Sequence, residues 1–139
     1  MTEAGAGVVR LARAARESVI AHARQAAPAE CCGLLIGRDQ RIEEARAARS
    51  IADRPTRYRI DPQDHFDALR EARQRGAGVV GFYHSHPSSA AVPSETDRAE
   101  ATYEHHLYLI VGIAAEEAEV RLFAWENGNF HERAFVTVG

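Results

Sequence analysis

Two histidines and one aspartate have the residue types and spacing of a metal site. The segment 82–87 reads Phe-Tyr-His-Ser-His-Pro, which places His84 and His86 two residues apart at the end of an apolar run. Side chains two residues apart on a strand lie on the same face, so both imidazoles can reach one ion. Ten residues separate His86 from Asp97, enough for a loop to fold back and bring a third ligand. Two imidazoles and one carboxylate leave the fourth position of a tetrahedral zinc site to water, as catalysis requires.

Two further residues could complete a hydrolytic site. Zinc lowers the pKa of a bound water to about 7, and a nearby base must then take its proton. Glu30 lies at the start of an otherwise apolar run, where a carboxylate needs either solvent or a partner. Ser94 lies three residues before Asp97, and its hydroxyl could stabilise an oxyanion. We therefore expect Glu30 to be the general base and Ser94 to stabilise the oxyanion.

Each of these features also has a structural explanation. A single His-x-His motif is weak evidence for a metal, Ser94 to Asp97 fits a helix capping box, and Glu30 could be a solvated residue at a strand end. Together, the five residues in the expected strand, loop and helix favour a site. Two histidines and a carboxylate are also the facial triad of non-haem Fe(II) oxygenases, which remain an alternative. Cys32 shares a strand face with Glu30, but a buried cysteine is more often an inert apolar residue.

The elements that position these residues are predicted from periodicity, caps and breakers. We expect helices at 12–27, 62–75 and 94–105, and strands at 8–12, 31–37, 41–51, 58–60, 78–84, 107–113, 119–125 and 130–138. Asp61 and Pro62 provide the N-cap and first turn of the second helix, and Asn127-Gly128 forms a hairpin turn. Helices mixed with strands predict an α/β (α+β) fold in which helices flank a mixed sheet, as one domain over residues 1–139.

Composition excludes several classes of function. The 139 residues are 45% apolar and 27% charged, as in a globular domain. A net charge of -3 without a basic cluster argues against nucleic acid. All 17 basic residues are arginine, which excludes lysine nucleophiles and Schiff bases. We expect no membrane span and, from residues 1–7, no secretory signal. The adjacent Cys31 and Cys32 do not suit a disulfide framework, so we expect a reducing cytoplasm.

In these residues the chain resembles the JAMM (MPN-plus) metalloproteases, and specifically their short prokaryotic stand-alone form. Their pattern is an upstream glutamate, a His-x-His-Pro motif, and an aspartate ten residues later with a serine three before it. The chain matches it with Glu30, His84-Ser85-His86-Pro87, Ser94 and Asp97. The resemblance implies one Zn²⁺ on His84, His86 and Asp97, with Glu30 as general acid/base and Ser94 as stabiliser of the tetrahedral intermediate. It also implies the family's cytidine-deaminase-like three-layer fold.

The resemblance further implies a substrate. Members of the family cleave peptide or isopeptide bonds after the C-terminal diglycine of ubiquitin-like proteins, and the short prokaryotic forms act on sulfur-carrier proteins. We expect such a tail to lie along a strand near His84 and the 87–93 loop. A zinc deaminase is excluded because the chain lacks His-x-Glu and Pro-Cys-x-x-Cys. A non-catalytic MPN-type scaffold is the second alternative, and a homodimer is a candidate oligomeric state. The carrier protein, the leaving group and any role of the two cysteines stay open at this stage.

Overall fold

The structure is a computed structural model that describes residues 7–139. In chain order its elements are β1 (Val9–Ala12), α1 (Arg13–Ala26), β2 (Cys32–Arg38), β3 (Arg41–Ala48), α2 (Pro62–Gln74), β4 (Gly78–His86), α3 (Glu95–Glu100), β5 (Leu107–Gly112), β6 (Glu119–Glu126), β7 (Asn129–Arg133) and β8 (Phe135–Val138). The sequence predicts no secretory signal in residues 1–7. Residues 1–6 of this stretch lie outside the described residues.

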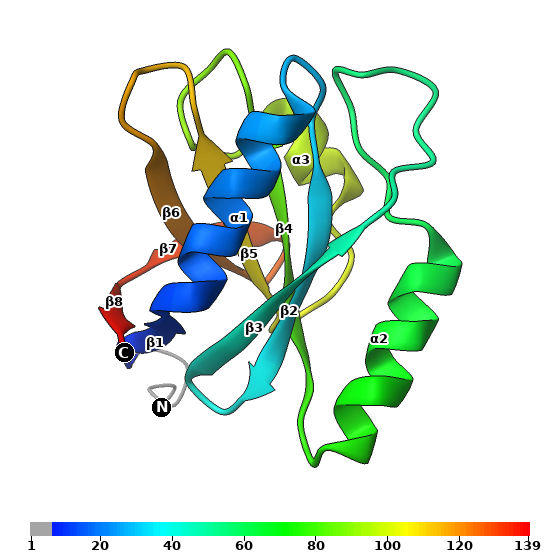
Figure 1. Ribbon diagram of the computed structural model, residues 1–139, viewed down its shortest axis with the longest axis vertical. Coiled ribbons are helices and arrows are strands. Elements are labelled where there is room, and N and C mark those ends of the chain that lie inside the picture. Colours follow the sequence, from blue (N-terminus) through cyan, green and yellow to red (C-terminus); the bar gives the residue numbers. More distant parts are fainter. Residues whose placement is uncertain (1–6) are drawn as a thin grey trace.

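The eight strands in the described part of the chain belong to one mixed sheet in the order β7-β6-β5-β4-β2-β3-β1-β8. The pairs β4–β5, β1–β3 and β1–β8 are parallel, and the other neighbours are antiparallel. Strands β7 and β8 are the two edges of the sheet, although only Ala134 separates them in the chain. The sheet must therefore curl, as Figure 1 shows, and the N–H of Val9 donates to the carbonyl of Ala134 at 3.0 Å.

Helices cover both faces of this sheet and define its two main cores. Helix α1 buries Ala15, Val19 and Ala23, a stripe with helical spacing, against one face. Helix α2 packs Ala68 and Ala72 against the other face. All six residues of β5 are buried because the strand is covered on both sides. The predicted mixed α/β, three-layer arrangement is confirmed (Figure 1).

Strands β4 and β5 approach each other closely at Gly81. A Cβ atom at this position would lie 2.0 Å from the carbonyl oxygen of Leu107, which is far inside van der Waals contact. Only glycine therefore fits in this register, where Gly81 pairs with Leu107. The contact sets the alignment of the strand that ends in His84 and His86.

Three predicted elements differ from those observed. The expected strand at 58–60 is only an isolated bridge between Ser50 and Ile60. The third helix ends at Glu100 rather than near His105, because the following backbone bonds elsewhere: the N–H of His105 donates to the carbonyl of Trp125 at 2.8 Å. The expected strand at 130–138 breaks at Ala134, where the chain leaves β6 and crosses to β1.

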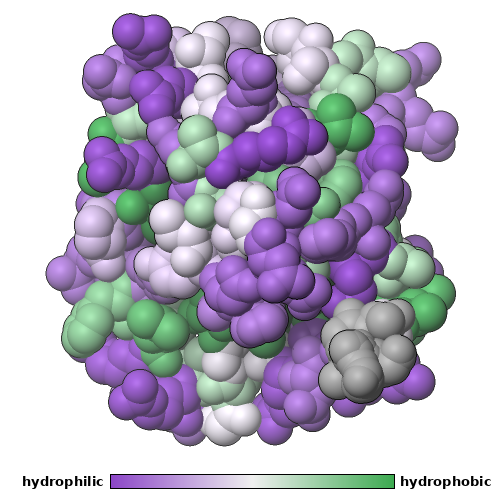
Figure 2. All heavy atoms as spheres, turned by 180° about the vertical axis from the view of Figure 1, so that it is seen from behind, coloured by the Kyte–Doolittle hydropathy of each residue, from purple (hydrophilic) through white to green (hydrophobic). Residues whose placement is uncertain are grey.

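No helix in the described part of the chain is long and apolar enough to cross a membrane. The face of the molecule turned away from the viewer in Figure 1 is mainly hydrophilic, with hydrophobic side chains in small separate groups (Figure 2). That surface is ordinary for a globular domain, where isolated apolar residues are common.

Candidate metal centre

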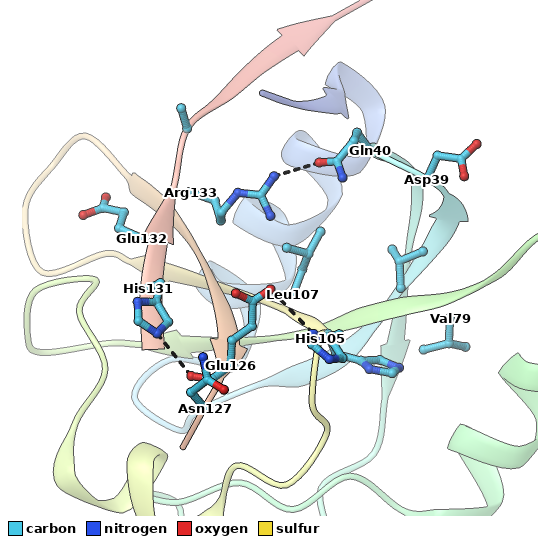
Figure 3. Close-up of a pocket in the computed structure, with 13 residues that line it drawn as sticks. Asp39, Gln40, Val79, His105, Leu107, Glu126, Asn127, His131, Glu132 and Arg133 are labelled. Carbon is cyan, nitrogen blue, oxygen red and sulfur yellow. Dashed lines mark hydrogen bonds and ion pairs between the residues drawn. The ribbon is translucent and has the colours of Figure 1, made fainter. Parts of the chain in front are cut away.

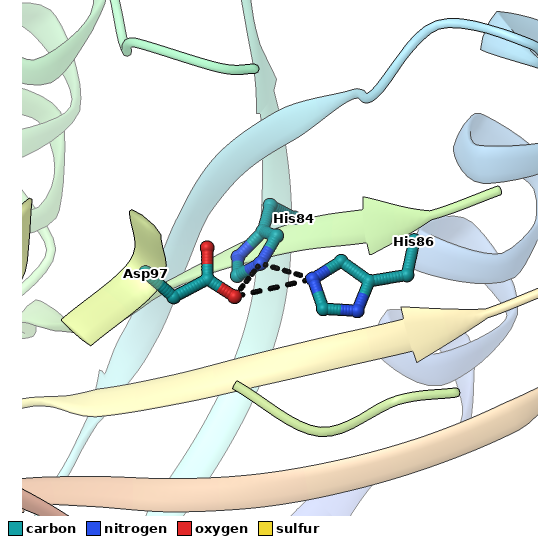
Figure 4. Close-up of side chains that lie close together, drawn as sticks. All are labelled: His84, His86 and Asp97. Atoms are coloured by element: carbon teal, nitrogen blue, oxygen red, sulfur yellow. Dashed lines mark hydrogen bonds and ion pairs between the residues drawn. The ribbon is translucent and has the colours of Figure 1, made fainter. Parts of the chain in front are cut away.

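His84, His86 and Asp97 come together as the sequence predicts. The two histidines end β4, and Asp97 lies in the first turn of α3. The three side chains point toward one another in Figure 4. The Nε2 atoms of His84 and His86 are 3.2 Å apart, and Oδ2 of Asp97 lies 3.2 Å and 3.1 Å from them. All three residues are at most 8% exposed.

The size of this triangle fits a tetrahedral metal ion. Ligand bonds of 2.0–2.1 Å give a tetrahedron whose edges are about 3.3 Å, close to the three observed separations. The protonation of His86 supports the same conclusion. Its Nδ1 lies 2.8 Å from the carbonyl oxygen of Ala90, which can only accept, so Nδ1 carries a hydrogen. In the neutral ring Nε2 then presents a lone pair toward Asp97 and His84. A cation is the natural partner for donor atoms that converge in this way.

Electrostatics favour the metal-binding charge state at His84 and Asp97, whereas they favour the protonated ring at His86. Burial lowers the pKa of His84, which keeps its imidazole neutral. Burial alone would raise the pKa of Asp97, but the hydrogen bonds with both imidazoles outweigh it and hold that pKa well below its ordinary value. The pKa of His86 is raised, because its bonds with Asp97 and Ala90 outweigh the effect of burial. The carboxylate is therefore ionised throughout the neutral range.

Glu30 lies two residues before the start of β2 and close enough to His86 and Asp97 to interact with their charges. Cys32 pairs with His84, and the N–H of Cys31 donates to Oγ of Ser85 at 2.9 Å. Continuing this antiparallel register places Glu30 opposite His86 and on the face that carries His84. Glu30 is partly buried, and burial raises its pKa to about 7. A carboxyl group with that pKa can both accept and donate a proton near neutral pH.

Ser94 caps α3 and also orients the metal ligand. Its Oγ accepts a hydrogen bond from the N–H of Asp97 at 3.0 Å, and its own N–H donates to Oδ2 of Asp97 at 2.9 Å. The predicted capping box is confirmed. Oδ2 is also the oxygen that faces the two imidazoles, so the cap holds the carboxylate in place. The side chain of Ser94 is exposed and can meet a substrate.

Cys32 lies opposite His84 in the sheet but is unsuited to metal binding. Burial raises the pKa of its thiol to about 12, so the sulfur stays protonated. Its Sγ lies 3.9 Å and 3.8 Å from the carbonyl oxygens of Ala48 and Arg49. Cys31 packs into the core on the face covered by α1. The expectation of an inert residue agrees with this environment.

Tyr58 is a site residue that sequence reasoning missed. Its ring stacks on the imidazole of His84, with centroids 4.4 Å apart and planes 16° from parallel. No motif links the two positions, which lie in different elements far apart in the chain. The carbonyl of Ala90, which holds His86, was also missed, since a backbone atom leaves no trace in residue types.

A groove lies beside Tyr58, the residue that stacks on His84. It has a volume of about 770 Å³ and runs between the stretch 51–60 and the extended residues Thr102 and Tyr103. Phe82 and Tyr108 also line it. Tyr58 belongs both to this lining and to the surroundings of His84, so the groove leads to the candidate site.

A second hollow, of about 960 Å³, lies at the other end of β4 (Figure 3). Its lining includes Val79, and at about 3.3 Å per residue the strand places this position roughly 20 Å from His86. In this hollow His131 contacts the backbone carbonyl oxygen of Glu126. His105 lies near the side-chain carboxylate of the same residue. We associate the candidate site with the smaller groove, because Tyr58 lines this groove and stacks on His84.

Comparison with known proteins identifies the family. A profile of the family described as prokaryotic homologs of the JAB domain matches residues 12–127. The chain belongs to the prokaryotic JAB family. A desampylase from Haloferax volcanii is 37% identical to this JAB-domain chain over 129 residues, covering 88% of the chain and 91% of the relative. A CysO-cysteine peptidase from Mycobacterium tuberculosis is 34% identical, over 68% of the chain and 66% of that protein. The predictions of the family and of the peptidase class are confirmed.

Solved structures support the fold of the JAB-domain chain. The solution structure of a Desulfitobacterium hafniense protein matches with a TM-score of 0.86 and 29% identity, over 94% of this chain and 93% of the other. A structure described as JAMM, a metalloprotease-like zinc site in the proteasome and signalosome, matches with a TM-score of 0.57 and 21% identity, over 94% and 99%. At that identity the second likeness shows the fold alone.

Proposed function

We propose that the chain is a zinc-dependent peptidase or isopeptidase that cleaves the bond after the C-terminal diglycine of a ubiquitin-like sulfur-carrier protein. The observation that carries the proposal is the triangle of His84, His86 and Asp97, beside a carboxyl group whose pKa is about 7. Relatives named desampylase and CysO-cysteine peptidase support the substrate class. One zinc ion per chain is part of the proposal.

In this mechanism the protein supplies a base, an acid and an oxyanion donor. Bound zinc supplies Lewis-acid activation of the attacking water and the scissile carbonyl. Glu30 accepts a proton from the water as its oxygen bonds to the carbonyl carbon. The hydroxyl of Ser94 donates to the carbonyl oxygen, on which negative charge develops. Glu30 then gives its proton to the leaving amine nitrogen as the carbon–nitrogen bond breaks, which leaves a carrier ending in diglycine.

The substrate tail is proposed to reach the site through the groove beside Tyr58. The sequence predicted that the tail lies along a strand near His84 and the 87–93 loop, and β4 itself is paired on one side with β2 and on the other with β5. Because β4 has no open edge, the tail would have to bind along another segment near His84. The groove is lined by Arg57, Tyr58 and Arg59 on one side and by Thr102 and Tyr103 on the other. The tail would lie in this groove in an extended conformation.

Cleavage of defined carriers tests the proposal. Ubiquitin-like carrier proteins ending in diglycine are extended by a short peptide, or joined through diglycine to a lysine side chain, and mass spectrometry follows the products. We expect release at the diglycine, and the two substrates separate peptidase from isopeptidase activity. Glu30→Gln should bind zinc but lose about 10²–10⁴-fold in rate. Glu17→Gln, an exposed carboxyl change on α1, is the matched control and should cleave normally.

The same preparation tests the alternatives. Protein purified without added metal is analysed for zinc and iron. Stoichiometric iron together with oxygen consumption would favour the non-haem oxygenase and overturn the peptidase. Bound zinc with every carrier left intact would favour a non-catalytic scaffold. Unchanged turnover in Glu30→Gln would refute the assigned base.

Three further expectations remain predictions. A reducing cytoplasm agrees with Cys31 and Cys32, which are both free. A homodimer would be detected by sedimentation of the purified protein. Independent folding of residues 1–139 as one domain would be seen as a single cooperative unfolding transition.

A further inference from the structure

The two histidines of the metal centre are held in different ways. His86 is anchored through Nδ1, which donates to the carbonyl of Ala90. His84 has no such anchor: within residues 7–139 its Nδ1 is buried and lacks a hydrogen-bond partner. Metal-binding histidines almost always use the second ring nitrogen to fix the orientation of the ring. Another contact must therefore orient His84.

The ring of Tyr58, which is not one of the metal ligands, contacts His84. It lies nearly parallel to the imidazole of His84 at a centroid distance of 4.4 Å, and so covers one face of that ring. A rotation of His84 about its χ2 angle would drive the imidazole into the Tyr58 ring. Burial raises the pKa of the Tyr58 phenol far above its ordinary value, so the side chain stays neutral. Tyr58 thus has the geometry to restrain His84 without titrating itself.

The segment 49–61, which carries Tyr58, contacts the candidate site at Glu30, at His84 and at helix α3. The carbonyl of Pro55 accepts a hydrogen bond from the N–H of Glu30 at 2.9 Å. Arg57 forms an ion pair with Glu100, on the same helix as Asp97. The ends of the segment are joined by the bridge between Ser50 and Ile60. Tyr58 is therefore held in place from several sides.

We infer that Tyr58 is a positioning residue that holds the imidazole of His84 in its metal-binding orientation and forms the wall between the metal ligands and the groove. The inference deepens the proposed function and rests on it for the presence of a metal, not for the identity of the substrate. It assigns Tyr58 no proton transfer.

Zinc affinity tests the inference without any substrate. Chelator competition is used to measure the zinc dissociation constant of the wild type, Tyr58→Phe and Tyr58→Leu. We expect Tyr58→Leu to weaken zinc binding by about 10–100-fold, the usual effect of losing an outer-shell partner of a metal ligand. Tyr58→Phe keeps the ring and should bind zinc as the wild type does. Loaded with Co²⁺, Tyr58→Leu should show a changed visible absorption spectrum, and Tyr58→Phe should not.

A matched control separates this role from the loss of groove lining. Tyr103 also lines the groove, but it contacts Phe82, His65 and His106 rather than His84. Tyr103→Leu should therefore leave zinc affinity unchanged. If Tyr58→Leu fails to fold, Tyr58→Met fills the space with a flexible apolar chain and should weaken zinc binding in the same way. Wild-type zinc affinity in folded Tyr58→Leu or Tyr58→Met would overturn the inference.

The outcomes for the inference and for the proposed function are distinguishable. Zinc binding that depends on Tyr58, with no carrier cleaved, would leave the inference standing and refute the peptidase. Cleavage together with zinc binding that is independent of Tyr58 would refute the inference alone. Zinc that fails to bind the wild type would refute both.

Discussion

Replacing Glu30 by glutamine should stabilise the metal-free protein above pH 7, although it removes the proposed base. The pKa of Glu30 is raised from 4.5 to about 7, mainly by burial and further by the negative charges of Asp97 and Glu100. Between these two values the folded state binds more protons than the unfolded state. The free energy of unfolding of the wild type therefore falls as pH rises through this window. Glutamine has no charge to bury and avoids this loss.

The magnitude follows from the pKa difference and the burial of the side chain. A rise from 4.5 to about 7, at 1.36 kcal/mol for each pKa unit, sets an upper limit of about 3 kcal/mol. Glu30 is only partly buried, so solvent screens part of this cost, and we expect about 1–2 kcal/mol. The stability advantage of Glu30→Gln over the wild type should therefore grow by about that amount between pH 5 and pH 8.

Urea unfolding of chelator-treated protein at both pH values measures this change. Comparison of the variant with the wild type cancels the titration of all other groups to a first approximation. The m-values should agree, so that midpoints report stability. Glu17→Gln, exposed on α1, should show no growth in the difference between pH 5 and pH 8. The reasoning is refuted if the Glu30→Gln difference stays constant with pH or shrinks.

Three other predictions concern the metal ligand, the cap and the sheet. Asp97→Asn should lower zinc affinity by more than about 100-fold, which exceeds the usual effect of substituting a residue that only orients a metal ligand. Circular dichroism should show that the variant still folds. Ser94→Gly should cut the cleavage rate by about 10²–10³-fold but lower the free energy of unfolding, measured by thermal unfolding, by only a few tenths of a kcal/mol. Ser94→Ala should lose the same factor in rate and also about 1 kcal/mol of stability, because alanine cannot cap the helix. Equal cleavage rates in the wild type and Ser94→Gly would remove the serine from the mechanism. Gly81→Ala should destabilise the protein by about 1–3 kcal/mol in urea unfolding, since its Cβ would meet the carbonyl of Leu107 at 2.0 Å, and a variant of native stability would show that β4 can shift.

Several elements could be predicted because their causes lie within a few residues. Helix α2 begins where Asp61 caps it, with Oδ1 accepting from the N–H of Gln63 at 2.9 Å. Strand β5 was expected from an unbroken apolar run and is buried along its length. The extent of α3 could not be predicted in this way. Residues after Glu100 suit a helix locally, but tertiary partners such as the carbonyl of Trp125 take their hydrogen bonds.

The sequence by itself determined which side chains can meet. The alternation of a strand sends His84 and His86 to one face, and the serine–aspartate spacing forms a cap that aims Asp97. Both are short-range consequences of backbone geometry. Only the tertiary structure decided that β4 has no open edge, that Glu30 lies opposite His86, and that Tyr58 covers His84. These contacts join residues distant in the chain, so they depend on how the sheet and its connecting segments pack and not on any local pattern.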